Sequence, residues 1–222
     1  MISAIITAAG NCTRFGREKL FCLIGKEPVF LKAVKKFLQV EEIDEVVLVV
    51  RKETRKRFER WLGKFNLNKV KLVEGGKERH ISAYKGVQES RGDYVLIHDA
   101  ARPLVTEKLI KKVIGAVKKH QAVMTALEAT TCVKRVNYRT LEVEECLSRE
   151  SSWLGQTPQA FKREIILNAY QRAVKGEISG MDDCELVRKT GVKVTVVPGE
   201  WTNKKVTLPT DLAIIRSWSK YV

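Results

Sequence analysis

The chain has 222 residues, and 41 Lys and Arg against 26 Asp and Glu give it a formal net charge of +15 at pH 7. Its hydrophobic fraction of 44% and charged fraction of 30% are typical of globular proteins. A chain of this length buries roughly 70% of the surface that its unfolded form exposes, so a substantial core is expected. No apolar run approaches the roughly 20 residues of a membrane span, which excludes that class of protein.

The first half of the chain alternates short apolar runs with longer segments of helical periodicity. The runs predict buried strands at 5–6, 45–50, 71–73 and 94–97. The segments between them predict one helix that starts at Pro28 and three others that span about 53–65, 78–90 and 106–119. Because strands that alternate with helices form right-handed crossovers, this pattern indicates an α/β fold with a mostly parallel sheet.

The pattern changes after the apolar run 123–127. Segments 132–136 and 141–143 flank Asn137, which predicts a β-hairpin with Asn137 in its turn. Such a hairpin is either an extra edge pair or an arm that reaches a partner. Beyond it we expect helices at 162–175 and 183–190, a strand at 192–197 and a last helix from Pro209. We therefore expect one domain, residues 1–222, from which an arm at 130–148 projects.

Three polar loops follow predicted strands, and in open α/β sheets ligands bind at the carboxyl ends of the strands. In the first loop the small residues would let backbone N–H groups approach a phosphate, and nearby cations would add positive charge. The small residues are Ala8, Ala9 and Gly10, and the cations are Arg14, Arg17 and Lys19. The spacing fits neither a Walker A loop nor a dinucleotide fingerprint. The loop is thus either an anion-binding loop or an ordinary strand–helix turn.

The second and third loops follow the strands near 73 and 97. Gly75 and Gly76 permit a close approach of the backbone to a ligand, or form a plain turn before a helix. Asp99 ends the other strand, where a carboxylate could hold Mg²⁺ together with substrate phosphates. Arg102 could bind a second phosphate.

Two residues near the third loop are given structural interpretations. His98 ends a strand, and we expect it to be a hydrogen-bonded core residue without a catalytic role. Thr106 is a better candidate than Asp99 for the cap of the following helix.

The charge and the cysteines bear on partners and location. The charge of +15 would also suit a basic nucleic-acid-binding protein, but the cations are mixed with acids and do not interleave with aromatic residues in a known module. We therefore expect most of them to be solvated.

The five cysteines show no metal-ligand spacing, and no basic segment precedes the first apolar residues. We expect reduced thiols and a cytoplasmic location.

Almost the whole chain, from Ala8 onward, resembles the 2-C-methyl-D-erythritol 4-phosphate cytidylyltransferase family. The segments 95–103, 156–161 and 205–213 are the most specific, and they occur in the order of the family. The resemblance implies a Rossmann-like nucleotidyltransferase domain with a β-arm that interlocks in a homodimer. It also implies transfer of a cytidylyl group from CTP to 2-C-methyl-D-erythritol 4-phosphate. A ribitol 5-phosphate cytidylyltransferase is the alternative, and residues near Arg149 and in the arm would decide between the two acceptors.

The resemblance also assigns roles to individual residues. Those implied to be catalytic, at the phosphates and the transition state, are Arg14, Lys19 and Lys205. The nucleotide would be surrounded by Ala8, Ala9, Gly10, Gly76 and Ser82. The acceptor would be bound by Arg102, Thr131, Arg149 and Lys205, and the metal by Asp99. Asp182 falls in an acidic segment like that of the family.

Four positions depart from the pattern of the family. Cys12 stands where a second glycine is usual, and Glu18 stands where a proline precedes the lysine. Lys77 replaces a common acidic residue. The Asp-Thr pair of the family's arm maps onto 131–132, and we take Thr131 as the substrate-binding threonine.

Overall fold

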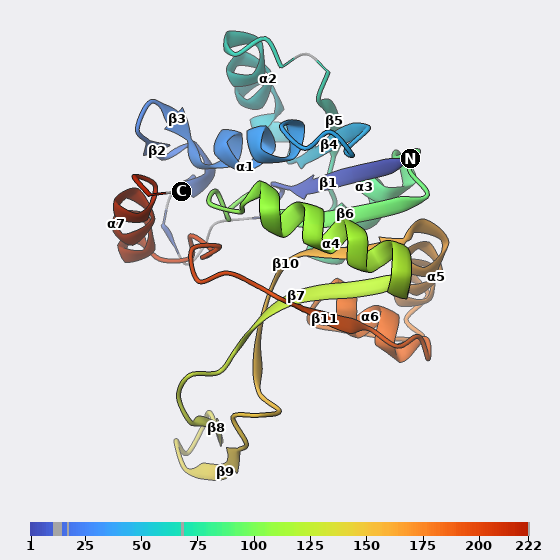
Figure 1. Ribbon diagram of the computed structural model, residues 1–222, viewed down its shortest axis with the longest axis vertical. Coiled ribbons are helices and arrows are strands. Elements are labelled where there is room, and N and C mark those ends of the chain that lie inside the picture. Colours follow the sequence, from blue (N-terminus) through green and yellow to red (C-terminus); the bar gives the residue numbers. More distant parts are fainter. Residues whose placement is uncertain (11–14, 17, 68, 222) are drawn as a thin grey trace.

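A computed structural model describes residues 1–10, 15–16, 18–67 and 69–221, and a seven-stranded sheet forms its centre (Figure 1). The order of the strands is β11-β7-β10-β6-β1-β4-β5. They are β1 (Ile2–Thr7), β4 (Glu45–Val50), β5 (Lys71–Glu74), β6 (Tyr94–Asp99), β7 (Ala122–Glu128), β10 (Trp153–Lys162) and β11 (Thr195–Pro198). β10 is antiparallel to β6 and β7, whereas the other neighbouring pairs are parallel. The predicted α/β class with a mostly parallel sheet is confirmed.

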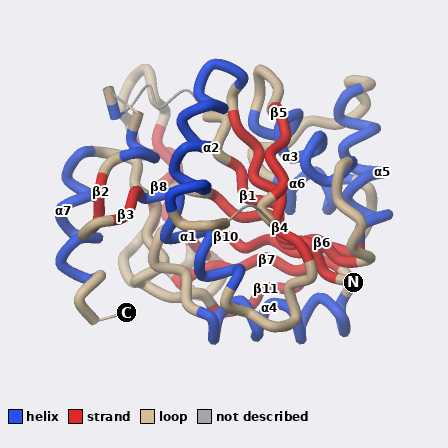
Figure 2. The backbone as a smooth tube through the Cα atoms, turned by 90° about the horizontal axis from the view of Figure 1, so that it is seen from above, coloured by secondary structure: helices blue, strands red, loops and turns tan. Residues whose placement is uncertain are grey.

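Helices cover both faces of this sheet (Figure 2). They are α1 (Val29–Leu38), α2 (Arg55–Lys64), α3 (Arg79–Gln88), α4 (Glu107–His120), α5 (Arg163–Val174), α6 (Asp183–Lys189) and α7 (Pro209–Trp218). Apolar side chains of α1, α2, α4 and α7 form one core cluster with alternate residues of β1, and those of α3, α5 and α6 form the other. Burial on both faces explains why the central strands are continuous apolar runs. No helix of the described part of the chain is long and apolar enough to cross a bilayer.

The close contact of α3 with the sheet depends on Gly86. A Cβ atom there would lie 2.5 Å from Cγ2 of Ile5 and 2.7 Å from Cγ2 of Val49, which belong to two neighbouring strands. Gly115 in α4 provides a matched helical position, since a Cβ atom there meets nothing within 4 Å.

Gly86→Ala is expected to lower the free energy of unfolding by about 1–3 kcal/mol, because the extra methyl group forces α3 away from a packed core. The control Gly115→Ala is expected to raise it by roughly 0.5–1 kcal/mol, because alanine favours an open helical site. Urea denaturation of both variants measures the two effects. Equal changes in the two variants would contradict the packing role of Gly86.

The predicted hairpin forms an arm that projects from the body (Figure 1). Its strands are β8 (Val133–Val136) and β9 (Val143–Leu147), and Oδ1 of Asn137 accepts hydrogen bonds from the N–H groups of Arg139 and Thr140 at 3.0 and 3.3 Å. The turn prediction for Asn137 is therefore confirmed. The second strand begins at Val143 and not at residue 141 as expected, because Leu141 has a φ of 61° and lies in the turn.

Two other boundaries and one strand differ from the predictions. Pro28 precedes α1 instead of starting it, because it pairs with Leu23 in a two-stranded ribbon of β2 (Leu23–Ile24) and β3 (Glu27–Pro28). The strand expected at 192–197 starts only at Thr195, where pairing with β7 begins. β10 was not predicted as a strand, although it lies between β6 and β7.

Candidate active site

A cavity of about 300 Å³ opens at the carboxyl ends of β1 and β6, next to the loop after β5. Of the described residues, those lining it are Thr7, Ala8, Ala9, Gly10, Lys19, Leu20, Lys77, Glu78, Arg79, Ser82, Asp99, Ala101 and Lys205. Four of these side chains are cations and two are carboxylates. The cavity thus carries net positive charge and suits an anionic ligand.

Asp99 lies at the centre of the charged groups, at the end of β6. Its Oδ2 is 2.8 Å from Nζ of Lys205 and 3.4 Å from Nε of Arg102, and its Oδ1 is 3.7 Å from Nε of Arg79. Burial alone would raise the pKa of the Asp99 carboxyl, but these positive charges outweigh it and hold the pKa well below its usual value. Asp99 is therefore ionised at neutral pH.

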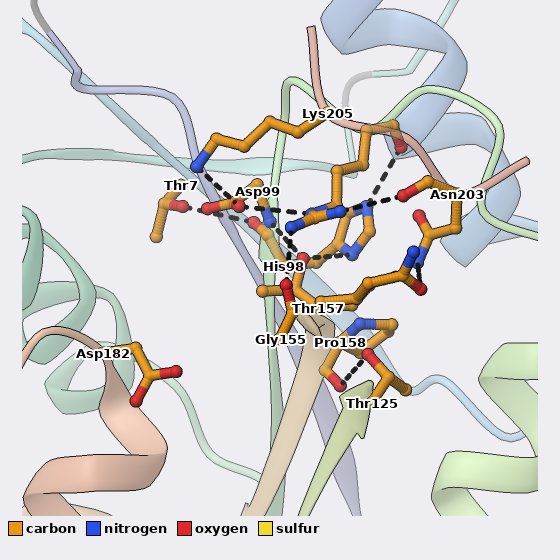
Figure 3. A network of polar contacts seen from close by, with 12 residues as sticks. Thr7, His98, Asp99, Thr125, Gly155, Thr157, Pro158, Asp182, Asn203 and Lys205 are labelled. Atoms are coloured by element: carbon orange, nitrogen blue, oxygen red, sulfur yellow. Dashed lines mark hydrogen bonds and ion pairs between the residues drawn. The ribbon is translucent and has the colours of Figure 1, made fainter. Parts of the chain in front are cut away.

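Lys205 and Asp99 are 106 positions apart in the sequence, and the loop before α7 brings them together (Figure 3). Asn203 of this loop is fully buried, and its Nδ2 donates a hydrogen bond to the carbonyl of Thr157 at 2.7 Å. The carbonyl of Asn203 accepts a hydrogen bond from Nη1 of Arg102 at 2.9 Å. These two bonds fix the loop to β10 and to the loop after β6, and so position Lys205.

His98 is a core residue, as expected. It is fully buried, its Nε2 lies 3.1 Å from the carbonyl of Arg102, and its Nδ1 lies 3.1 Å from Oγ1 of Thr157. Burial lowers the pKa of His98 to about 4, so the ring is neutral at pH 7. Oγ1 of Thr157 also accepts a hydrogen bond from the N–H of Asp99 at 3.1 Å. The irregularity of β10 between Gln156 and Gln159 thus places Thr157 behind the site.

The two glycine-containing loops are packed against each other. A Cβ atom on Gly75 would lie 2.6 Å from Cβ of Ala9 and 2.8 Å from Oγ of Ser82. The N–H of Gly76 donates to the same Oγ at 3.0 Å. Gly75 is therefore required for close packing between loops, and Ser82 fixes the backbone of Gly76 beside the cavity.

Arg102 lies behind Asp99, in a buried position. Besides the contact of its Nε with Asp99, its Nη1 donates to Asn203 O at 2.9 Å and its Nη2 to Gly155 O at 3.4 Å. Arg102 is absent from the cavity wall formed by the described residues. In this arrangement it stabilises the site, and its contact with an acceptor stays a prediction.

The remaining assigned residues lie elsewhere. Thr131 and Arg149 are exposed at the base of the arm and do not line the cavity within the described part of the chain. Arg14, Arg17 and Cys12 lie outside the described residues. Glu18, which replaces a proline of the family, forms an ion pair with Arg51 after β4 and thereby ties the loop that carries Lys19 to the sheet.

Asp182 and Thr106 have helix-capping roles. The Asp182 carboxylate accepts from the N–H of Glu185 at 2.8 Å at the start of α6, and from Nε2 of Gln159 at 2.8 Å. It does not contribute to the cavity wall as far as the structure describes it. Oγ1 of Thr106 accepts from the N–H of Leu109 at 3.0 Å, which confirms Thr106 as the cap of α4.

Arg79 and Asn203 are site residues that the sequence analysis missed. Arg79 follows a Gly-Gly turn and reads locally as the first residue of an amphipathic helix, whereas its partners are Asp99 and Asp183. The partners of Asn203 are about 46 and 101 positions away. Neither residue lies in the most specific family segments, 95–103, 156–161 and 205–213, so no local signal marked it.

A metal would have few protein ligands here. Within the described ranges, no three His, Cys, Asp or Glu side chains are grouped closely enough to hold a metal ion. Asp99 and Glu78 are the carboxylates of the cavity wall in this part of the chain. Such a donor set fits Mg²⁺, which is commonly held by one or two carboxylates together with substrate phosphates.

Comparison with known proteins identifies the family. A family model described as 2-C-methyl-D-erythritol 4-phosphate cytidylyltransferase matches residues 2–218. The protein of that name from Geobacillus kaustophilus is 37% identical over 213 residues, which are 94% of this chain and 92% of the relative. The one from Dictyoglomus thermophilum is 36% identical over 215 residues, which are 95% and 93% of the two chains.

Solved structures agree with this assignment. The crystal structure of 4-diphosphocytidyl-2C-methyl-D-erythritol synthase from Anaerococcus prevotii superposes with a TM-score of 0.87 at 31% identity, and the match covers 99% of this chain and 98% of that one. The fold, the order of the motifs and the full-length similarity lead to one conclusion: the chain belongs to the 2-C-methyl-D-erythritol 4-phosphate cytidylyltransferase family.

Proposed function

We propose that this protein transfers a cytidylyl group from CTP to 2-C-methyl-D-erythritol 4-phosphate and releases pyrophosphate. The observation that carries the proposal is the positively charged cavity in which Lys205 and Asp99 meet at 2.8 Å, in a chain that belongs to this family over almost its full length. The protein is thus a nucleotidyltransferase.

The reaction needs charge control more than proton transfer. An oxygen of the acceptor phosphate bonds to the α-phosphorus of CTP, the bond from that phosphorus to the bridging oxygen breaks, and pyrophosphate leaves with the electron pair. The second pKa of a phosphomonoester is about 6, so the nucleophile is already ionised near neutral pH. His98 is buried and bonded at both ring nitrogens, and the site does not require it as a base.

Different residues of the cavity are assigned to different parts of the two substrates. Ala8, Ala9, Gly10 and Ser82 line the wall where we place the nucleotide, because their small side chains admit a ligand close to the backbone. The backbone of Gly76, which is bonded to Ser82, is assigned to the same wall. Lys19 and Arg14 are assigned to the triphosphate and the transition state. Lys205 is assigned to the acceptor phosphate, whose approach to CTP brings two anions together.

We further propose Mg²⁺ as the cofactor, held by Asp99 and the phosphates of CTP. The ionised, oxygen-bearing side chain of Asp99 is the type of ligand that Mg²⁺ prefers. The bound ion would neutralise phosphate charge. Because Lys205 contacts the same carboxylate, an arriving phosphate would have to compete with Asp99 for this lysine.

The arm supports a homodimer as the working form. Tyr138, Leu141 and Val143 of the arm are 79%, 77% and 59% exposed, an unusual amount of apolar surface on a thin projection. Thr131 and Arg149 lie on the same projection and face no cavity wall of the described chain. We propose that the arm packs on a second copy and that these two residues contribute to the acceptor site of that copy.

The double variant Tyr138→Glu/Leu141→Glu is expected to weaken dimerisation by roughly ten-fold or more, because charges replace apolar side chains at the proposed contact. Sedimentation equilibrium measures the dissociation constant. Tyr221→Glu, at an 85% exposed tyrosine outside the arm, is the matched control and should leave the constant unchanged. A wild-type protein that stays monomeric at tens of micromolar would contradict the arm-mediated dimer.

Pyrophosphate release by the purified protein tests the function. The reaction contains CTP, Mg²⁺ and 2-C-methyl-D-erythritol 4-phosphate, and ATP, GTP and UTP replace CTP in the controls. Release that requires both CTP and this acceptor supports the proposal. Turnover only with ribitol 5-phosphate would retain cytidylyl transfer and overturn the acceptor.

A further inference from the structure

Arg79 is a cation of the cavity wall that the assigned roles leave unused. It is the first residue of α3, and 33% of its side chain is exposed. Its Nη1 donates to Oδ2 of Asp183 at 2.8 Å, and its Nε lies 3.7 Å from Oδ1 of Asp99. A guanidinium has five N–H donors, and the bond to Asp183 is the one hydrogen bond that this side chain makes to the described residues. Donors therefore remain for a ligand in the cavity.

Asp183 holds this guanidinium from behind. It is fully buried in the first turn of α6, and the hydroxyl of Tyr170 donates to its Oδ1 at 2.8 Å. Tyr170 belongs to α5 and is also fully buried. The charge of Asp183 raises the pKa of Arg79, whose guanidinium, like that of any arginine in a protein, is cationic. The two oxygens of Asp183 thus have separate partners, which fixes the position of Arg79 relative to α5 and α6.

We propose that Arg79 is a further phosphate-binding residue of this enzyme and that Asp183 and Tyr170 position it. The inference rests on the cytidylyl transfer proposed above. A planar guanidinium can donate two parallel hydrogen bonds to phosphate oxygens. A phosphate oxygen would replace the weak 3.7 Å contact of Arg79 with Asp99. The 2.8 Å bond to Asp183 would keep the guanidinium of Arg79 in place.

Steady-state kinetics of Arg79→Gln, Asp183→Asn and the double variant test this chain of contacts. Loss of one phosphate-binding cation should lower kcat/KM by about 10²-fold. Asp183→Asn keeps the shape but removes the charge, and should lower kcat/KM by roughly ten-fold. If Asp183 acts through Arg79, the double variant should lie within about two-fold of Arg79→Gln. A KM raised for CTP assigns Arg79 to the nucleotide, and one raised for the acceptor assigns it to the acceptor phosphate.

Glu164→Gln on α5 is the control, because Glu164 pairs with Lys162 on the surface and should leave the kinetics unchanged. Tyr170→Phe removes a single hydroxyl and provides a milder test if Asp183→Asn does not fold. As a single substitution, Tyr170→Phe should lower kcat/KM by about three-fold. Added to Arg79→Gln, it should cause no further loss.

Three outcomes would count against the inference. An active wild type with Arg79→Gln within about two-fold of it overturns phosphate binding by Arg79 and leaves the proposed function standing. Losses that multiply in the double variant overturn the positioning role of Asp183. A wild type that transfers no cytidylyl group overturns the proposed function and this inference together.

Discussion

Lys205→Ala is expected to lower kcat/KM by on the order of 10²-fold or more and to leave the fold intact. The ammonium group of Lys205 lies 2.8 Å from Asp99 at the point where two anionic substrates must meet. Its side chain is 33% exposed and packs into no core cluster, and Arg79 and Arg102 would still pair with the buried Asp99, so the fold should survive its removal. Pyrophosphate release gives kcat and KM, and thermal unfolding reports the fold.

Lys204→Ala is the matched control for this prediction. Lys204 belongs to the same loop, but its Nζ lies 3.1 Å from Oδ1 of Asp211 at the start of α7, outside the cavity wall of the described residues. Its replacement should leave kcat/KM within about two-fold of wild type. Near-wild-type turnover of Lys205→Ala would remove Lys205 from the site. Arg14→Ala is expected to lose activity to a similar degree, although Arg14 lies outside the described residues.

The parallel part of the sheet could be predicted because each strand is marked by its own residues. The runs that became β4 and β6 are apolar on both faces, and helices with one apolar side follow them. β10 gives no such signal. It contains Gly155 and Pro158, which weaken a strand prediction, and it is interrupted between Gln156 and Gln159. Its place between β6 and β7 depends on long-range pairing that no local pattern reveals.

The same distinction applies to the active site. The loops after β1, β5 and β6 could be recognised from small and charged residues at strand ends, and they do form one cavity. The contacts that organise this cavity join residues far apart in sequence, as Arg79 to Asp183 and Arg102 to Asn203 do. Side-chain type alone does not indicate such pairs, because each partner also suits an exposed helix or loop.

Two departures from the family pattern, Lys77 and Glu18, lie at or next to the cavity. Lys77 lines the cavity, where it adds a positive charge in place of the usual acidic residue. Glu18 pairs with Arg51 and so has a structural partner next to Lys19. Both side chains therefore act beside the proposed phosphate site, one by its charge and the other by holding the loop.

Asp99→Asn is expected to lower kcat by about 10²–10³-fold, the second large effect predicted for this site. The amide has nearly the shape of the carboxylate, but it is a poor ligand for Mg²⁺. The substitution also removes the negative charge with which Lys205, Arg79 and Arg102 form ion pairs. Because Arg102 is buried, the weakened partner of its Nε–H should also lower the free energy of unfolding, by roughly 1–3 kcal/mol.

Two measurements separate loss of the metal ligand from loss of stability. The Mg²⁺ concentration that gives half-maximal activity should rise in Asp99→Asn if Asp99 binds the ion. Asp93→Asn is the control, since Asp93 is an exposed carboxylate that pairs with the amino terminus, and it should change neither kcat nor the Mg²⁺ dependence. A folded Asp99→Asn variant with wild-type kcat and an unchanged Mg²⁺ dependence would exclude Asp99 as the metal ligand. A large fall in kcat with an unchanged Mg²⁺ dependence would instead assign Asp99 to the placement of its cationic partners, Lys205, Arg79 and Arg102.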